Sequence, residues 1–180
     1  MAFGIDESEV TPYKPEDAKS ISREFTFQKD TDDFDFLKDV LLLLSISVER
    51  RAQRYGLFGK GVTLKITYSD MKSITRSKMI ESSRKAEIIY QESLGLLEKV
   101  PHRMLRLIGV GIHHLSPIEG NRQLSLTDLM KENEEDKDLK ELLMPLQERY
   151  GLSFIDNLDK VFKGETLYKT IEYMRKHKNR

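Results

Sequence analysis

Apolar and polar residues alternate along three stretches of the chain, with the period of two that is typical of half-buried β-strands. In the first stretch Ile21, Phe25 and Phe27 share one side with a single charged residue, Arg23. A further strand has few apolar residues, and it is predicted because only a turn at residues 69–70 separates it from the strand before, as in a β-hairpin. In chain order, strands are predicted at residues 19–27, 61–68, 72–80 and 103–115.

Two other stretches place apolar residues three or four positions apart, which predicts amphipathic helices. The first helix is predicted at residues 34–55, between an Asp-rich N-terminal cap and Gly56. The second is predicted to begin after Ser82 and Ser83, the candidate caps, and to end near Pro101, with Ala86, Ile89, Ser93 and Leu97 along one stripe. The resulting β-α-β-β-α-β order predicts an α+β domain in which two helices cover one face of a four-stranded antiparallel sheet and leave the other face open.

The chain beyond the last strand has a different pattern. An acidic run occupies residues 131–138, and a helix-prone tail begins at Leu139. Pro145 is expected to break this tail, and Gly151 and Gly164 to divide it again, into two or three short helices. The expected divisions of the chain are residues 1–18, an extended connector; 19–116, the α+β domain; 117–138, a linker with the acidic run; and 139–180, the helical tail.

Charge is balanced over the whole chain but not within its parts. The 180 residues include 30 Lys and Arg and 30 Asp and Glu, so the net charge is zero. The α+β domain has 17 basic and 12 acidic groups, whereas residues 1–18 and 117–148 have net charges of −4 and −5. Neutrality is therefore a cancellation between segments, and it does not exclude a polyanionic partner for the domain.

The composition excludes several classes of protein. The chain has no cysteine, which excludes a disulfide scaffold and metal sites that use cysteine ligands. The longest apolar run, residues 40–44, is far shorter than the roughly 20 residues that cross a bilayer. No membrane partner is therefore expected, and a cytoplasmic location is the default.

Proteins of this topology have many functions, so the function has to be inferred from the residues of the open face. The predicted strand at residues 72–80 has no aromatic side chain, which argues against the base stacking of RNA-recognition domains. Residues 57–80 instead offer hydroxyl groups and five basic residues against one acidic residue. Such groups bind phosphate oxygens without reading the base sequence. A solvated polar face is the alternative, since threonine and lysine are common on exposed strands.

Four motifs occur in the same order and at similar spacing as in one known family. They are KSISREFTF at 19–27, GVTLK at 61–65 leading to YSDM at 68–71, TRS at 75–77, and RLIGV at 106–110. Together they resemble the little-finger domain, the C-terminal polymerase-associated domain, of bacterial Y-family translesion DNA polymerases, a group that includes DNA polymerase IV and UV-mutagenesis polymerases. The resemblance covers about residues 4–116, and it implies that residues 1–18 are a thumb remnant and a linker.

The resemblance implies that the open face grips the backbone of primer–template DNA, independently of sequence, during translesion synthesis in DNA repair. The DNA-binding residues that it implies by position are Lys19, Ser20, Ser22, Thr63, Lys65, Ser73, Thr75, Arg76, Ser77, Lys78 and Arg106. An autonomous RNA-binding or protein-interaction domain of the same topology remains the alternative.

The resemblance also implies where catalysis takes place. Nucleotidyl transfer needs two metal ions held by clustered carboxylates. In this family those carboxylates, and the Mg²⁺ that they hold, belong to a palm domain that has no counterpart in this sequence. We interpret Asp30, Asp32, Asp33 and Asp35 as residues of a helix start. The chain is therefore expected to be a non-catalytic fragment without a cofactor.

Residues 122–129 resemble the peptide by which bacterial Y-family polymerases bind the sliding clamp (beta subunit). Thr127 stands where the family has phenylalanine, so Leu129 is the candidate for the apolar pocket. Alternatively, the leucines of this segment pack on the chain's own helices. The predicted clamp-binding residues are Gln123, Leu124, Ser125, Leu126 and Leu129. Primer–template DNA and the clamp are the expected partners of an otherwise monomeric chain.

One histidine pair and one group of methionines carry smaller expectations. His113 and His114 are adjacent on a predicted strand, so they are expected on opposite faces and not in a metal site. Met71, Met79 and Met104 are expected to fill gaps in the core.

Overall fold

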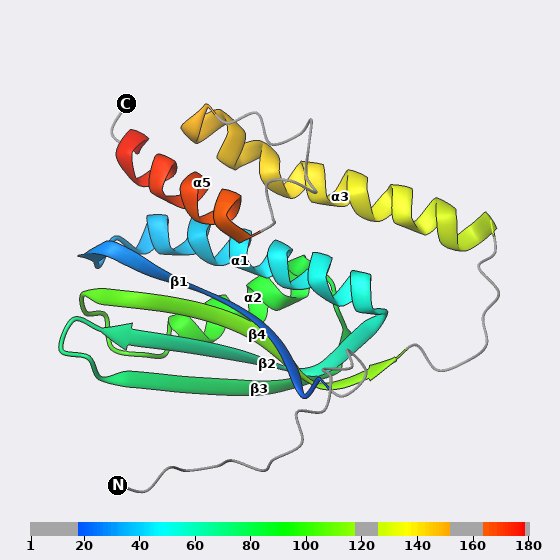
Figure 1. Cartoon of the computed structure of the whole chain (residues 1–180), viewed down its shortest axis with the longest axis horizontal. Helices are drawn as coiled ribbons and strands as arrows, with labels where there is room; N and C mark the ends of the chain where they lie inside the picture. Colours follow the sequence, from blue (N-terminus) through cyan, green and yellow to red (C-terminus); the bar gives the residue numbers. More distant parts are fainter. Residues whose placement is uncertain (1–17, 118–125, 152–163, 179–180) are drawn as a thin grey trace, which may run out of the picture.

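The computed structural model describes residues 18–117, 126–151 and 164–178, and of residues 126–136 it describes the backbone alone. The elements, in chain order, are β1 (Ser20–Thr31), α1 (Phe34–Tyr55), β2 (Leu57–Tyr68), β3 (Ser73–Ser83), α2 (Ala86–Leu97), β4 (Leu105–Pro117), α3 (Leu126–Tyr150) and α5 (Gly164–His177). The α+β class and the predicted β-α-β-β-α-β order are confirmed (Figure 1).

The strands form one antiparallel sheet in the order β1-β4-β2-β3. Alternate residues of the strands, such as Val62, Leu64 and Ile66 in β2, are buried in the core with residues of α1 and α2. The two helices lie on one side of the sheet (Figure 1). We call the opposite side the open face.

The caps of α1 are those predicted from the sequence, whereas the cap of α2 is not. The Asp33 side chain accepts a hydrogen bond from the Phe36 N–H at 3.2 Å, and Gly56 ends α1 with a left-handed φ of 64°. The N-cap of α2 is Lys85, which has no side-chain cap. Ser83 belongs to β3 because it pairs with Gly59, so the predicted caps at Ser82 and Ser83 are wrong.

Three of the four strands, β1, β2 and β3, are longer than predicted. β2 begins at Leu57, four residues before the predicted start, because residues 57–59 pair with the end of β4. Glycines at positions 59 and 61 interrupt the side-chain alternation there, so the sequence pattern does not reveal this pairing.

The helical tail forms a layer of its own. Helices α3 and α5 lie on the side of α1 that faces away from the sheet (Figure 1). Consistent with cover on both sides, every residue of α1 from Phe36 to Glu49 except Lys38 is buried. The buried apolar residues of the tail are Leu139, Leu143, Leu146, Tyr150, Leu167, Ile171 and Met174.

The structure corrects two expectations for the tail. Helix α3 begins at Leu126, inside the expected linker, and it continues through Pro145. Proline removes one helical hydrogen bond and crowds the preceding turn. Leu143 and Leu146 on either side of it are 0% and 1% exposed, so their burial offsets the cost of a proline within the helix.

A buried carboxylate joins the tail to α1. Asp39 accepts hydrogen bonds from the Arg149 guanidinium and from the Tyr150 hydroxyl, both at 2.6 Å. Burial and the hydrogen bond to Asp39 raise the pKa of Tyr150, so its hydroxyl stays protonated and donates. This contact fixes the end of α3 on the first half of α1.

Candidate nucleic-acid interface

The register of the sheet arranges the polar residues of the open face in rows. Residues that pair across antiparallel strands point to the same face. The three central rows, read from β1 through β4 and β2 to β3, are Ser22, Gly111, Thr63 and Ser77; Glu24, Gly109, Lys65 and Thr75; and Thr26, Leu107, Thr67 and Ser73. The first and third rows each bring short hydroxyl side chains from three strands together, whereas the middle row has one hydroxyl, that of Thr75.

Hydroxyl groups pair across β2 and β3. The side-chain oxygens of Thr63 and Ser77 are 2.9 Å apart, and those of Thr67 and Ser73 are 2.8 Å apart. A hydroxyl can donate one hydrogen bond and accept others. Each pair therefore keeps capacity for a ligand on the open face.

Two glycines form the floor of a groove in the middle of this face. A Cβ atom at Gly109 would lie 2.8 Å from the Cβ of Glu24, and one at Gly111 would lie 2.8 Å from the carbonyl oxygen of Ile21. The groove has a volume of about 210 Å³, and its walls include Ser22 and Lys65. Because the floor has no side chains, a ligand can approach the sheet backbone closely. We call it the glycine groove.

Two cations of the open face, Lys65 and Arg106, are paired with carboxylates. The Lys65 ammonium lies 3.1 Å from a Glu24 oxygen, and this ion pair spans β4 above Gly109. The Nε of Arg106 lies 3.3 Å from an oxygen of Asp30. The face therefore carries less free positive charge than the count of basic residues indicates.

Arg76 and Lys78 do not share the face of the other predicted DNA-binding residues. Arg76 pairs with Leu64 and Lys78 with Val62, both of which face the helices. Accordingly, the Lys78 ammonium contacts Glu92 of α2 at 2.5 Å. The sequence motif groups consecutive residues of β3, but consecutive residues of a strand point to opposite faces.

The remaining predicted residues are where the sequence places them. Ser20, Ser22, Thr63, Lys65, Ser73, Thr75 and Ser77 belong to strands of the open face, and the exposed Lys19 directly precedes β1. Glu24, Asp30, Gly109 and Gly111 also belong to the site but were not predicted as site residues from the sequence. The period of two could have placed Glu24 beside Ser22, because they share a face. Asp30 has no such signal, since the β1–β4 register shifts between Thr26 and Thr31.

The two adjacent histidines are side by side, so the expectation that they lie on opposite faces is wrong. His114 has a left-handed φ of 54°, and its Nδ1 lies 2.5 Å from that of His113. Burial and the neighbouring His114 lower the pKa of His113. Within the described residues no group of three or more histidines and carboxylates could hold a metal ion.

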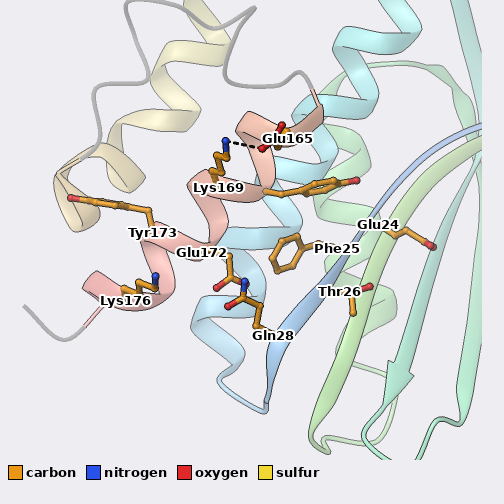
Figure 2. A pocket seen from close by; sticks show the side chains of 10 residues that line it. Glu24, Phe25, Thr26, Gln28, Glu165, Lys169, Glu172, Tyr173 and Lys176 are labelled. Atoms are coloured by element: carbon orange, nitrogen blue, oxygen red, sulfur yellow. Dashed lines mark ion pairs between the residues drawn. The ribbon is translucent and has the colours of Figure 1, made fainter.

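A second groove, of about 740 Å³, lies between β1 and α5 (Figure 2). The ring of Phe25 points from β1 toward α5, and its centroid is 5.7 Å from that of Tyr168. The charged residues of the lining are three acidic and two basic, and Glu165 pairs with Lys169 at 2.7 Å. This balance does not favour a phosphate ligand, unlike the hydroxyl rows of the open face.

Comparison with known proteins identifies the family. Residues 18–126 match the model of the impB/mucB/samB family C-terminal domain, which covers the whole sheet and both of its helices. The chain belongs to this family.

Relatives of this impB/mucB/samB domain are DNA polymerases. The chain is 30% identical to DNA polymerase IV of Clostridium kluyveri over 163 residues, which cover 86% of the chain and 41% of that protein. It is 37% identical to DNA polymerase IV 1 of Mesorhizobium japonicum over 118 residues, which cover 64% of the chain and 26% of that protein. The chain therefore spans less than half the length of these curated relatives.

Among solved structures, the little finger domain of PolIV in complex with the beta-clamp processivity factor is 19% identical. The match covers 59% of this chain and 97% of that one, with a TM-score of 0.48. Because this TM-score is below 0.5, the fold is assigned from the strand order and the family model and not from this match.

The predicted clamp-binding residues lie at the boundary of the impB/mucB/samB domain. Gln123, Leu124 and Ser125 lie outside the described residues. Leu126 and Leu129 belong to the first turns of α3.

The part of the chain that the structure describes contains no helix long and apolar enough to cross a membrane.

Proposed function

We propose that this chain is the non-catalytic C-terminal part of a Y-family DNA polymerase. Its open face grips the backbone of primer–template DNA independently of sequence, and residues 123–129 tether it to the sliding clamp during translesion synthesis. The family match and the DNA polymerase IV relatives support the assignment to a polymerase.

The glycine groove with its flanking hydroxyl rows is the observation that carries the proposal. Ser22, Thr63 and Thr75 line it with short donors and acceptors, and Lys65 supplies a cation. Groups of this kind bind phosphate and sugar oxygens but are too short to read base edges deep in a groove of the duplex. They suit an enzyme that must hold DNA of any sequence.

The same residues do not favour the alternative of an RNA-binding domain. β3 contains no aromatic residue, and stacking on strand aromatics is how domains of comparable topology hold single-stranded RNA. The flanking hydroxyl pairs between β2 and β3 instead suit a continuous phosphate backbone.

Catalysis belongs, in this proposal, to the part of the polymerase that the match does not include. The Asp-rich segment does not fit a metal ion, because three of its four carboxylates have other partners: Asp30 pairs with Arg106, Asp33 caps α1, and Asp35 lies 3.1 Å from Lys38. The Mg²⁺ ions of nucleotidyl transfer would be held by the palm domain.

Salt-dependent binding of a fluorescent primer–template duplex tests the proposal. Lys65→Ala with Arg106→Ala should weaken binding at low salt and reduce the slope of log K against log salt by about two units, since each phosphate contact contributes about one. Fluorescence anisotropy over a NaCl series measures both quantities.

Arg76→Ala with Lys78→Ala is the matched control, because it removes the same charge from the other side of the sheet. Its slope should stay closer to that of the unmodified chain. An unchanged slope for the Lys65 and Arg106 variant, or a larger change for the control, would contradict the proposed face.

A further inference from the structure

An exposed methionine occupies the tip of the β2–β3 hairpin in a strained conformation. Met71 has a left-handed φ of 68°, and its side chain is among the most exposed apolar ones, at 63%. Left-handed backbone is unfavourable for a residue with a Cβ atom, and glycine or asparagine occupies such turn positions at lower cost. The expectation that Met71, Met79 and Met104 fill the core is wrong, since all three are exposed.

The turn holds Met71 in place through its backbone. The Met71 N–H donates to the carbonyl of Tyr68 at 2.9 Å, and the Lys72 N–H donates to the Asp70 carboxylate at 3.0 Å. None of these bonds needs the thioether side chain. The left-handed backbone at Met71 therefore has an energetic cost that burial of the side chain does not offset. An exposed methionine in such a position points to a binding partner.

The neighbours of Met71 belong to the proposed DNA-binding face. An Arg106 guanidinium nitrogen lies 2.9 Å from the Met71 sulfur. The Ser69 N–H donates to the carbonyl of Met104 at 3.0 Å, which brings a second exposed methionine to the same tip. Arg103 is also there, since it forms an ion pair with Asp70 at 2.7 Å. The tip thus combines two apolar side chains with cations.

We propose that Met71, supported by Met104, makes an apolar contact with a deoxyribose or base edge of the bound duplex where the DNA passes the end of the open face. This inference rests on the proposed function, because Arg106 would bind a phosphate next to it. Methionine is among the apolar residues that DNA-binding proteins insert between base steps, beside polar contacts from arginine and lysine. A protein surface is the other occupant that the experiment distinguishes.

Binding of a primer–template duplex by Met71→Ala and Met71→Gly variants tests the inference. An apolar contact releases no counterions, so affinity should fall about three- to tenfold by the same factor at every salt concentration. Met71→Gly should keep a Tm at or above that of the unmodified chain, because glycine accepts the left-handed backbone. Met144→Ala, at a similarly exposed methionine of α3, is the matched control and should bind like the unmodified chain.

The outcomes separate this inference from the proposed function. Unchanged affinity of both Met71 variants, while Lys65→Ala with Arg106→Ala still lowers the slope, overturns the inference alone and leaves a protein surface as the occupant of the tip. A loss that varies with salt also overturns it, because Met71 would then act through Arg106. If the Lys65 and Arg106 variant leaves the slope unchanged, the proposed function itself fails.

Discussion

Glu24 and Lys65 face each other across the glycine groove, and their ion pair has a functional cost. Both side chains are about half exposed, at 52% and 46%, and an ion pair so exposed adds about 0–1 kcal/mol to stability. A phosphate that binds Lys65 has to displace the Glu24 carboxylate. Under the proposed function, Glu24 therefore competes with the DNA backbone for the cation of the groove.

Glu24→Gln should raise affinity for a primer–template duplex about two- to fivefold at low salt, because it removes this competitor. The free energy of unfolding should change by less than about 0.5 kcal/mol. Glu81→Gln removes the same charge at an exposed position of β3 and serves as the control. Equal gains in anisotropy titrations of the two variants would show a general charge effect and not competition in the groove.

At the level of elements, the start of α3 bears on the proposed clamp tether. The helix begins at Leu126, so the second half of the peptide that resembles a clamp-binding motif is helical in this structure. An isolated helical turn is marginal in water, so the first turn of α3 can unwind at low cost. A clamp pocket that binds an extended peptide would have to unwind this first turn of α3.

Capture of the chain on immobilised sliding clamp measures this tether. Gln123→Ala with Leu126→Ala should abolish capture, because it removes the orienting amide and one apolar anchor. Thr127→Phe, which restores the residue usual in the family, should increase capture. Equal capture of all three chains would contradict the tether and favour packing of the leucines on the chain's own helices.

For the whole molecule, the tail is part of the folded core. Leu143 and Met144 are adjacent on α3, but Leu143 is fully buried and Met144 is 48% exposed. Leu143→Ala should lower the free energy of unfolding by about 2–5 kcal/mol, and Met144→Ala by less than about 0.5 kcal/mol. Urea unfolding followed by circular dichroism checks both. A negligible effect of Leu143→Ala would mean that α3 does not pack on the domain as described.

The sequence by itself determined the elements of the domain and one side of its sheet. Alternation predicted that Thr63 and Lys65 lie opposite Val62 and Leu64, and the caps at Asp33 and Gly56 predicted both ends of α1. These features depend on residues close in sequence, so the period of two and the cap chemistry suffice.

Only the tertiary structure decided which distant residues meet. The register placed Gly109 between Glu24 and Lys65, and it turned Arg76 away from the open face. Packing carried α3 through Pro145, and the turn exposed Met71. Strand order, register and the burial of the tail arise from contacts between residues far apart in the chain, which no local pattern encodes.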